Sequence, residues 1–216
     1  MKEDELKSEE LEKEIKEKIE SKKRNKITLI FLVIFGAVII GFFAWVIIGN
    51  IQNNFEYMGV KFEVVNEIAP YRTNIVLGEK NAITGAVTQV PYYFYIRTDP
   101  RELEKIPFEG KLNLAKDMVI NSTDPFSCDG NGILGMTNLA RLLRAMGVNV
   151  IKDQTADCDI QGRYIFLNLE PGNETKIVQI GPMCYKMYIN DCEVLESTER
   201  FMIEILVETN KMVGKE

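Results

Sequence analysis

Three glycines, Gly130, Gly132 and Gly135, stand in the spacing G-x-G-x-x-G, within the stretch CDGNGILGMTNLARLLRAMGVNVIKD that ends at Asp153. This order is typical of a dinucleotide-binding loop, where a pyrophosphate rests on the start of a helix and a later acid holds the ribose. The approach NSTDPFSCD is polar and contains Pro125, although the motif requires a buried parallel strand there. We therefore expect a loop that caps a helix, and no cofactor.

A second candidate for chemistry is the group Asp99, Arg101, Glu102 and Glu104. A pair of carboxylates could serve hydrolysis of a glycosidic bond, so this group allows a membrane-tethered hydrolase of an envelope polymer. Charges on a short exposed helix are, however, usually solvated or ion-paired. We expect no catalytic role for them.

Asp124, Asp129 and Asn131 could ligate calcium, and the first two are also alternative hydrolase carboxylates. An EF-hand loop requires a carboxylate at its twelfth position, which is Ala140 when counted from Asp129. We expect no metal site.

The composition excludes several classes of function. The chain has 216 residues and no histidine, which excludes Ser-His-Asp and Cys-His catalysis and histidine-ligated zinc. Its net charge of −6 argues against nucleic-acid binding, which depends on Lys and Arg that neutralise phosphates. The aromatic run PYYFYIR therefore indicates a sheet strand, not a platform for stacking bases.

All four cysteines, Cys128, Cys158, Cys184 and Cys192, follow the most apolar stretch of the chain. An even number of cysteines in an extracytoplasmic domain predicts two disulfides. Their gaps of 30, 26 and 8 residues do not suit a zinc site. Three pairings are possible, and we favour Cys184–Cys192 with Cys128–Cys158.

Two glycosylation sequons agree with an outside location. They begin at Asn121 and Asn173. Asn173 follows Pro171-Gly172, which predicts an exposed hairpin turn between RYIFLNL and KIVQI.

Residues 27–49, ITLIFLVIFGAVIIGFFAWVIIG, contain no charged side chain. A helix of this length spans about 34 Å, enough to cross the hydrocarbon core of a bilayer. A cleaved signal peptide fits less well, because the apolar stretch is too long and no A-x-A-like site follows it. We predict a transmembrane signal anchor.

The flanks of this stretch predict its orientation. Lys22, Lys23, Arg24 and Lys26 precede it, and the next charge after it is Glu56. The positive-inside rule places the N-terminus in the cytoplasm, and Trp45 lies in the expected outer aromatic belt. Residues 1–26 carry nine acids and nine bases and predict a solvated charged helix, although a partner-binding helix is an alternative.

Periodicity predicts the elements of residues 50–216. Alternating segments enriched in β-branched and aromatic residues predict strands. Helical spacing from Ile133 to Met146, followed by Gly147, predicts an amphipathic helix, and a second helix is favoured over a strand for STERFMIEILVETNKM. Asp99-Pro100 predicts one further short helix start. The expected class is α+β, with a largely antiparallel sheet and two main helices.

These observations predict three parts: a charged cytoplasmic segment (1–26), a transmembrane helix (27–49) and a disulfide-stabilised outer domain (50–216). The expected function is binding or assembly at the outer face of a cell membrane. The expected partners are the lipid bilayer and another membrane or envelope protein, or a second copy of the chain, and not nucleic acid. The tethered hydrolase is the alternative.

Overall fold

The computed structural model describes residues 31–47, 49, 53–80 and 87–213. The chain divides into two compact units, Met1–Gln52 and Asn53–Glu216. Each unit is described by itself below.

In the first unit, residues 31–47 are helical and most of their side chains are exposed, including Trp45 at 73%. The rings of Phe42 and Trp45 lie 6.5 Å apart. No helix in the described ranges combines the length and apolar character needed to cross a membrane, so the predicted transmembrane helix is not supported. Residues 27–30 and 48 of that stretch lie outside the described residues. So do residues 1–26, with the predicted charged helix and Lys22, Lys23, Arg24 and Lys26.

The second unit begins with a four-stranded sheet in the order β1-β2-β3-β4, in which every neighbouring pair is antiparallel. Met58 and Gly59 have positive φ angles of 51° and 81° and form the two-residue turn of the first hairpin. The strands are β1 (Asn54–Tyr57), β2 (Val60–Val64), β3 (Tyr71–Lys80) and β4 (Val87–Ile96).

A six-stranded sheet follows, in the order β5-β9-β10-β8-β6-β7. Only its β9–β10 pair is antiparallel, and the other four pairs are parallel. The predicted antiparallel arrangement therefore describes the first sheet and is wrong for most of the second. The strands are β5 (Phe108–Glu109), β6 (Asp117–Ser122), β7 (Asn149–Ile151), β8 (Ile165–Pro171), β9 (Lys176–Gly181) and β10 (Cys184–Ile189).

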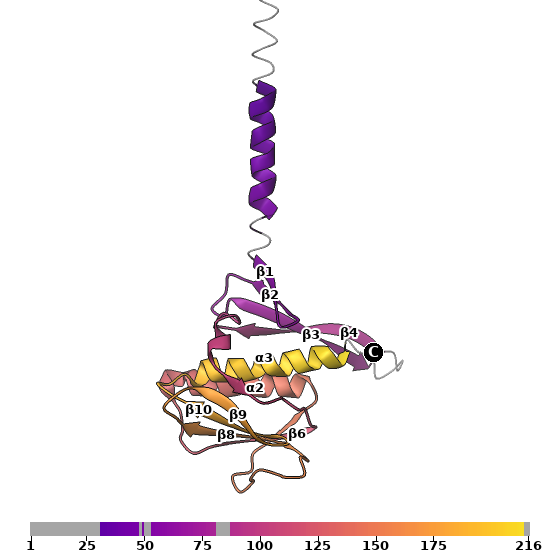
Figure 1. Cartoon of the computed structure of the whole chain (residues 1–216). Helices are drawn as coiled ribbons and strands as arrows, with labels where there is room; N and C mark the ends of the chain where they lie inside the picture. The colour runs from indigo at the N-terminus through magenta and orange to yellow at the C-terminus, as the bar shows by residue number, and fades with distance from the viewer. Residues whose placement is uncertain (1–30, 48, 50–52, 81–86, 214–216) are drawn as a thin grey trace, which may run out of the picture. The chain divides into compact units, whose positions relative to one another are not determined.

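Two long helices, α2 (Asn131–Ala145) and α3 (Val194–Val213), lie side by side between the two sheets (Figure 1). The prediction of two main helices is confirmed for this unit, and α3 resolves the C-terminal ambiguity in favour of a helix. Gly147, with φ 78°, ends α2 as expected, and Val148 N–H donates to Leu143 O over 2.9 Å. At Asp99-Pro100 the structure has only a short 3-10 turn, η1 (Leu103–Lys105), and a second one, η2 (Cys128–Gly130), precedes α2.

Helix α3 is buried on nearly all sides because it packs against elements of both sheets. Phe201, Ile203 and Ile205 are each 0% exposed. The buried Arg200 of this helix has partners there: its Nε donates to Ile106 O over 3.2 Å, and its guanidinium pairs with Glu204 over 2.6 Å. One apolar core thus joins both sheets and both helices, which confirms the α+β class.

Candidate functional site

A groove with a volume of about 470 Å³ lies between β4 and α2. Its base is apolar and is formed by Phe94 of β4 and Met202 of α3, which are both buried. The loop between β2 and β3 contributes Glu67 and Ile68, and the Ile68 side chain is 86% exposed. The size and the mixture of an apolar base with a few polar groups are typical of ligand-binding sites in proteins.

One wall of the groove is a face of α2. Leu134, Asn138 and Arg141 line it. Their spacing of four and three residues places them on one side of the helix. Leu139 and Leu143 are each 0% exposed and pack into the core from the other side, so the groove-facing side of α2 is fixed.

The other wall is β4, which is an edge strand. Its only strand partner among the described residues is β3. In an antiparallel pair, alternate residues direct their backbone groups toward the partner and away from it. Pro91 has no N–H, and the N–H of Arg97 donates elsewhere. The backbone N–H and C=O groups of the odd-numbered residues of β4 therefore point away from β3. Those of Tyr93 and Tyr95 lie on the open edge of the sheet.

Glu199 of α3 holds the end of β4 in place. Its carboxylate, which is 1% exposed, accepts the N–H of Arg97 over 2.7 Å and the N–H of Thr98 over 3.0 Å. Burial raises the pKa of Glu199, and the two backbone N–H groups oppose that rise. Glu199 thus contacts the backbone of Arg97, and the Arg97 side chain lines the groove.

Two exposed arginines, Arg97 and Arg141, line the groove from opposite walls. Neither guanidinium has a hydrogen-bond or ion-pair partner within the described part of the chain. Arg72 contrasts with them, since it pairs with Glu63 over 2.5 Å and lies 5.0 Å from the centre of the Tyr93 ring. The groove therefore offers unpaired positive charge above an apolar base.

Each glycine of the motif has a local structural reason, which is a positive φ at Gly130 and close packing at Gly132 and Gly135. Gly130 precedes α2 with φ 93°. A Cβ on Gly132 would collide with the backbone oxygen of Phe126, and a Cβ on Gly135 would collide with the Thr198 side chain of α3. The spacing thus reflects close approach of a loop and of a second helix.

One argument against the motif was nevertheless wrong. The chain enters the glycine loop from β6, which contains the buried residues Met118 and Val119 and runs parallel to β7 after α2. The expected β-α-β order therefore exists, with a polar loop between the strand and the glycines. Asp153 follows β7, and its carboxylate accepts the N–H and the hydroxyl of Thr155, which lower its pKa.

The carboxylates near η1 are held in local contacts. Asp99 accepts two hydrogen bonds from the Arg101 side chain and one from the Tyr71 hydroxyl. The Arg101 side chain is the main cause of the lowered pKa of Asp99. Glu102 and Glu104 are exposed. None of these contacts joins Asp99 to a second carboxylate.

The acids of the glycine loop are also exposed. Asp124 accepts the N–H of Phe126 over 3.2 Å, and Asp129 has a positive φ of 53°. Asn131 begins α2. The described residues contain no group of three or more His, Cys, Asp or Glu side chains that could hold a metal ion.

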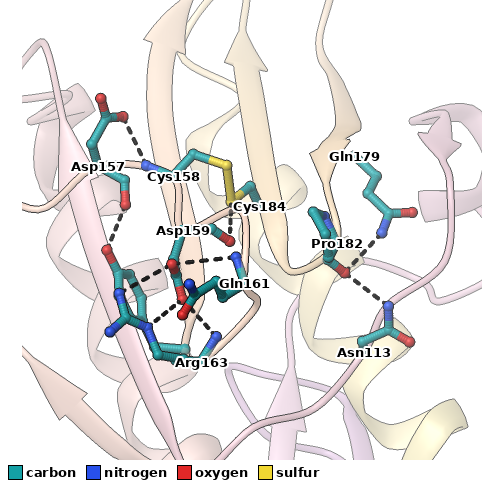
Figure 2. The surroundings of a disulfide bond; sticks show 10 residues. Asn113, Asp157, Cys158, Asp159, Gln161, Arg163, Gln179, Pro182 and Cys184 are labelled. Carbon is teal, nitrogen blue, oxygen red and sulfur yellow. Dashed lines mark hydrogen bonds and ion pairs between the residues drawn. A yellow bond between two sulfur atoms is a disulfide. The ribbon is translucent and has the colours of Figure 1, made fainter.

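The prediction of two disulfides is confirmed, but the favoured pairing is wrong. The bonds are Cys128–Cys192 and Cys158–Cys184. Cys184 begins β10 and Cys192 follows its end, so an extended strand separates them by far more than a disulfide can span. Figure 2 shows the second bond, near which Asn113 and Gln179 both donate to Pro182 O.

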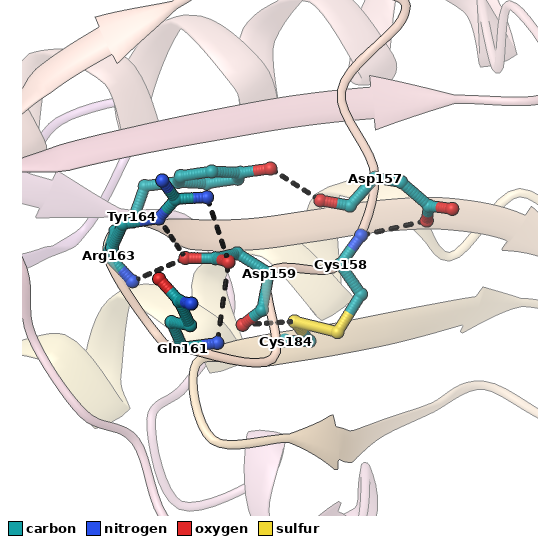
Figure 3. Close-up of polar contacts among 7 residues, drawn as sticks. All are labelled: Asp157, Cys158, Asp159, Gln161, Arg163, Tyr164 and Cys184. Carbon is teal, nitrogen blue, oxygen red and sulfur yellow. Dashed lines mark hydrogen bonds and ion pairs between the residues drawn. A yellow bond between two sulfur atoms is a disulfide. The ribbon is translucent and has the colours of Figure 1, made fainter.

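The loop that carries Cys158 is ordered by Asp159 (Figure 3). The Asp159 side chain, which is 6% exposed, accepts the N–H of Arg163 over 2.7 Å, its Nε over 3.0 Å and the N–H of Gln161 over 3.3 Å. The Arg163 side chain is the main cause that lowers the pKa of Asp159 to about 2. The Tyr164 hydroxyl donates to Asp157 O over 2.5 Å. These contacts are structural.

The two sequons differ in their surroundings. Asn121 lies in β6, and its Nδ2 donates to Ala156 O over 3.2 Å, beside a second, mostly apolar cavity of about 320 Å³. Asn173 is exposed in the turn between β8 and β9. The predicted hairpin there is wrong, because β10 lies between β8 and β9 in the sheet.

Sequence reasoning missed the groove residues Arg97, Asn138 and Arg141. The only signal was the run PYYFYIR, which was correctly interpreted as a strand. Nothing in that run shows that the strand lies at a sheet edge opposite a helix. Comparison with protein-family models, with curated proteins and with solved structures finds no match.

Proposed function

We propose that the chain is a membrane-tethered binding protein, which displays Asn53–Glu216 on the outer face of a cell membrane and engages another membrane or envelope protein through the groove between β4 and α2. The observation that carries this proposal is the groove, which combines an open strand edge, an apolar base and two unpaired arginines.

The location rests on two further observations. Residues 27–49 are uniformly apolar in sequence, with four basic residues just before them. All four cysteines of the chain are in disulfides, which are typical of an oxidising extracytoplasmic compartment.

Photocrosslinking in intact cells tests the binding function. The full chain carries a photoreactive amino acid either at Asn138, which lines the groove, or at the exposed Thr137 beside it, which does not. We expect a discrete crosslinked product from position 138 alone. Its second component should be a membrane or envelope protein that binds the purified full chain.

The control positions decide the outcome. The same product from both positions, or none from position 138, would refute the groove as the binding surface. A product that contains only this chain would replace the heterologous partner with self-association. Adding Arg97→Glu should abolish the product, because it reverses a charge on the groove wall without changing the core.

A further inference from the structure

We infer that the ligand of the groove is an extended acidic peptide segment of the partner, which pairs with β4 as an added strand. This inference rests on the proposed binding function and specifies the chemistry of the ligand.

The open edge of β4 favours an extended ligand. Tyr93 and Tyr95 direct their backbone N–H and C=O groups away from β3, and both residues line the groove. Pairing would end near Tyr95, because the N–H groups of Arg97 and Thr98 are already bound to Glu199. An unpaired strand edge is a template for a further strand, and peptides bind this way in grooves between an edge strand and a second element.

The charges of the groove favour an acidic ligand. Arg97 and Arg141 are unpaired within the described residues, and Glu67 is the one acidic residue that lines the groove with them. The chain as a whole has a net charge of −6. The charges of residues 1–26 sum to zero, so the excess of acidic residues lies after them. The net negative charge of the second unit therefore disfavours an acidic ligand in general, and the two guanidiniums attract it locally at the groove.

The apolar base of the groove favours apolar side chains on one face of the ligand. Side chains of an added strand alternate between its two faces. Apolar side chains on one face would cover Phe94 and Met202, and acidic side chains on the other would lie at the rim, where both arginines are exposed. The matching sequence pattern alternates apolar and acidic residues.

The test uses the full chain in detergent micelles and three fluorescent seven-residue peptides. The first alternates valine and glutamate, the second has glutamine in place of glutamate, and the third carries N-methyl groups that block strand pairing. Fluorescence anisotropy measures the dissociation constant of each peptide for the wild type and for Arg97→Gln, Arg141→Gln and Arg144→Gln. Arg144 is the matched control, because it is an exposed arginine of α2 that does not line the groove.

We expect the acidic peptide to bind about tenfold more tightly than the glutamine peptide, as charge-assisted contacts to arginine predict. Arg97→Gln and Arg141→Gln should each weaken its binding roughly five- to tenfold, whereas Arg144→Gln should change it by less than about twofold. N-methylation should abolish binding. Unchanged thermal denaturation of the variants would show that they fold.

Equal binding of the acidic and glutamine peptides, or an equal effect of Arg144→Gln, would overturn the acidic ligand. Unchanged binding of the N-methylated peptide would overturn strand addition, and failure of all three peptides to bind would overturn both. If crosslinking at position 138 succeeds while the peptides fail, the groove still binds a partner of different chemistry. If both fail, the proposed function fails as well.

Discussion

At the scale of single residues, Asp159 is the clearest contributor to stability that depends on pH. Its carboxylate is held by Arg163 and by backbone N–H groups, and its pKa is lowered from 3.8 to about 2. The folded protein therefore favours the charged form. This contribution is fully present above pH 3.8 and is lost as the pH falls toward 2.

We predict that Asp159→Asn lowers the thermal denaturation midpoint at pH 7, and that its difference from the wild type shrinks between pH 4 and pH 2. The reason is that the wild-type carboxylate becomes protonated over this range and then resembles the amide. Thermal denaturation at pH 7, 4, 3 and 2 measures the effect, with Asp124→Asn as an exposed control. Parallel pH profiles for the wild type and Asp159→Asn would contradict the assignment.

Gly135 makes a second prediction at this scale. A Cβ at this position would meet the hydroxyl of Thr198, which is buried and donates to Val194 O and Leu195 O. Gly135→Ala should therefore destabilise the protein by about 1–3 kcal/mol, as overpacked interiors do. In the Thr198→Ala background, Gly135→Ala should lower the free energy of unfolding by less than it does in the wild type, because the hydroxyl that the new methyl group would meet is absent. Chemical denaturation of the wild type, both single variants and the double variant measures this difference. Simple additivity of the two substitutions would show that the glycine is not required for helix packing.

At the scale of elements, the two disulfides hold different parts of the fold. Cys128–Cys192 joins the starts of α2 and α3, whereas Cys158–Cys184 joins a surface loop to β10. With sequence separations of 64 and 26, restriction of the unfolded chain by these bonds stabilises the fold by about 4.3 and about 3.5 kcal/mol. Only the first bond positions the helix that lines the groove.

We predict that the paired variants Cys128→Ala/Cys192→Ala and Cys158→Ala/Cys184→Ala both lower the free energy of unfolding, but that only the first weakens binding of the valine-glutamate peptide. Denaturant titration measures stability, and fluorescence anisotropy measures binding, at a temperature where both variants are folded. An equal loss of binding in both variants would mean that general destabilisation, and not the position of α2, causes it.

The same elements show what the sequence could predict. The helix around Leu139 and the strand Cys184–Ile189 follow from local periodicity, whereas the helix around Ile205 follows from the helix propensity of its residues. The strand order does not, because it depends on contacts between distant residues. The disulfide pairing was wrong for this reason. Cys184 and Cys192 are close in sequence, but the strand β10 between them holds them apart in space. The groove escaped prediction for the same reason, because Arg97 and Arg141 meet only after the sheet and helix are placed.

At the scale of the whole molecule, the proposed location requires the two ends of the chain to lie on opposite sides of a membrane. Residues 1–26 contain no cysteine, and all four cysteines are bonded to one another. A single introduced cysteine is therefore the one free thiol of the protein, and its labelling reports on which side of the membrane it lies. Ser8 lies in the charged segment, and Glu174 lies in an exposed turn of the second unit.

We predict that a membrane-impermeant thiol reagent labels Glu174→Cys in intact cells and labels Ser8→Cys only after the cells are permeabilised. The reason is that four basic residues precede the apolar stretch and hold its N-terminal side in the cytoplasm. The wild type should remain unlabelled without a reductant, which controls for exposed native thiols. Labelling of Ser8→Cys in intact cells would reverse the orientation. Labelling of Glu174→Cys only after permeabilisation would place the groove on the cytoplasmic side and refute the proposed display of the second unit outside the cell.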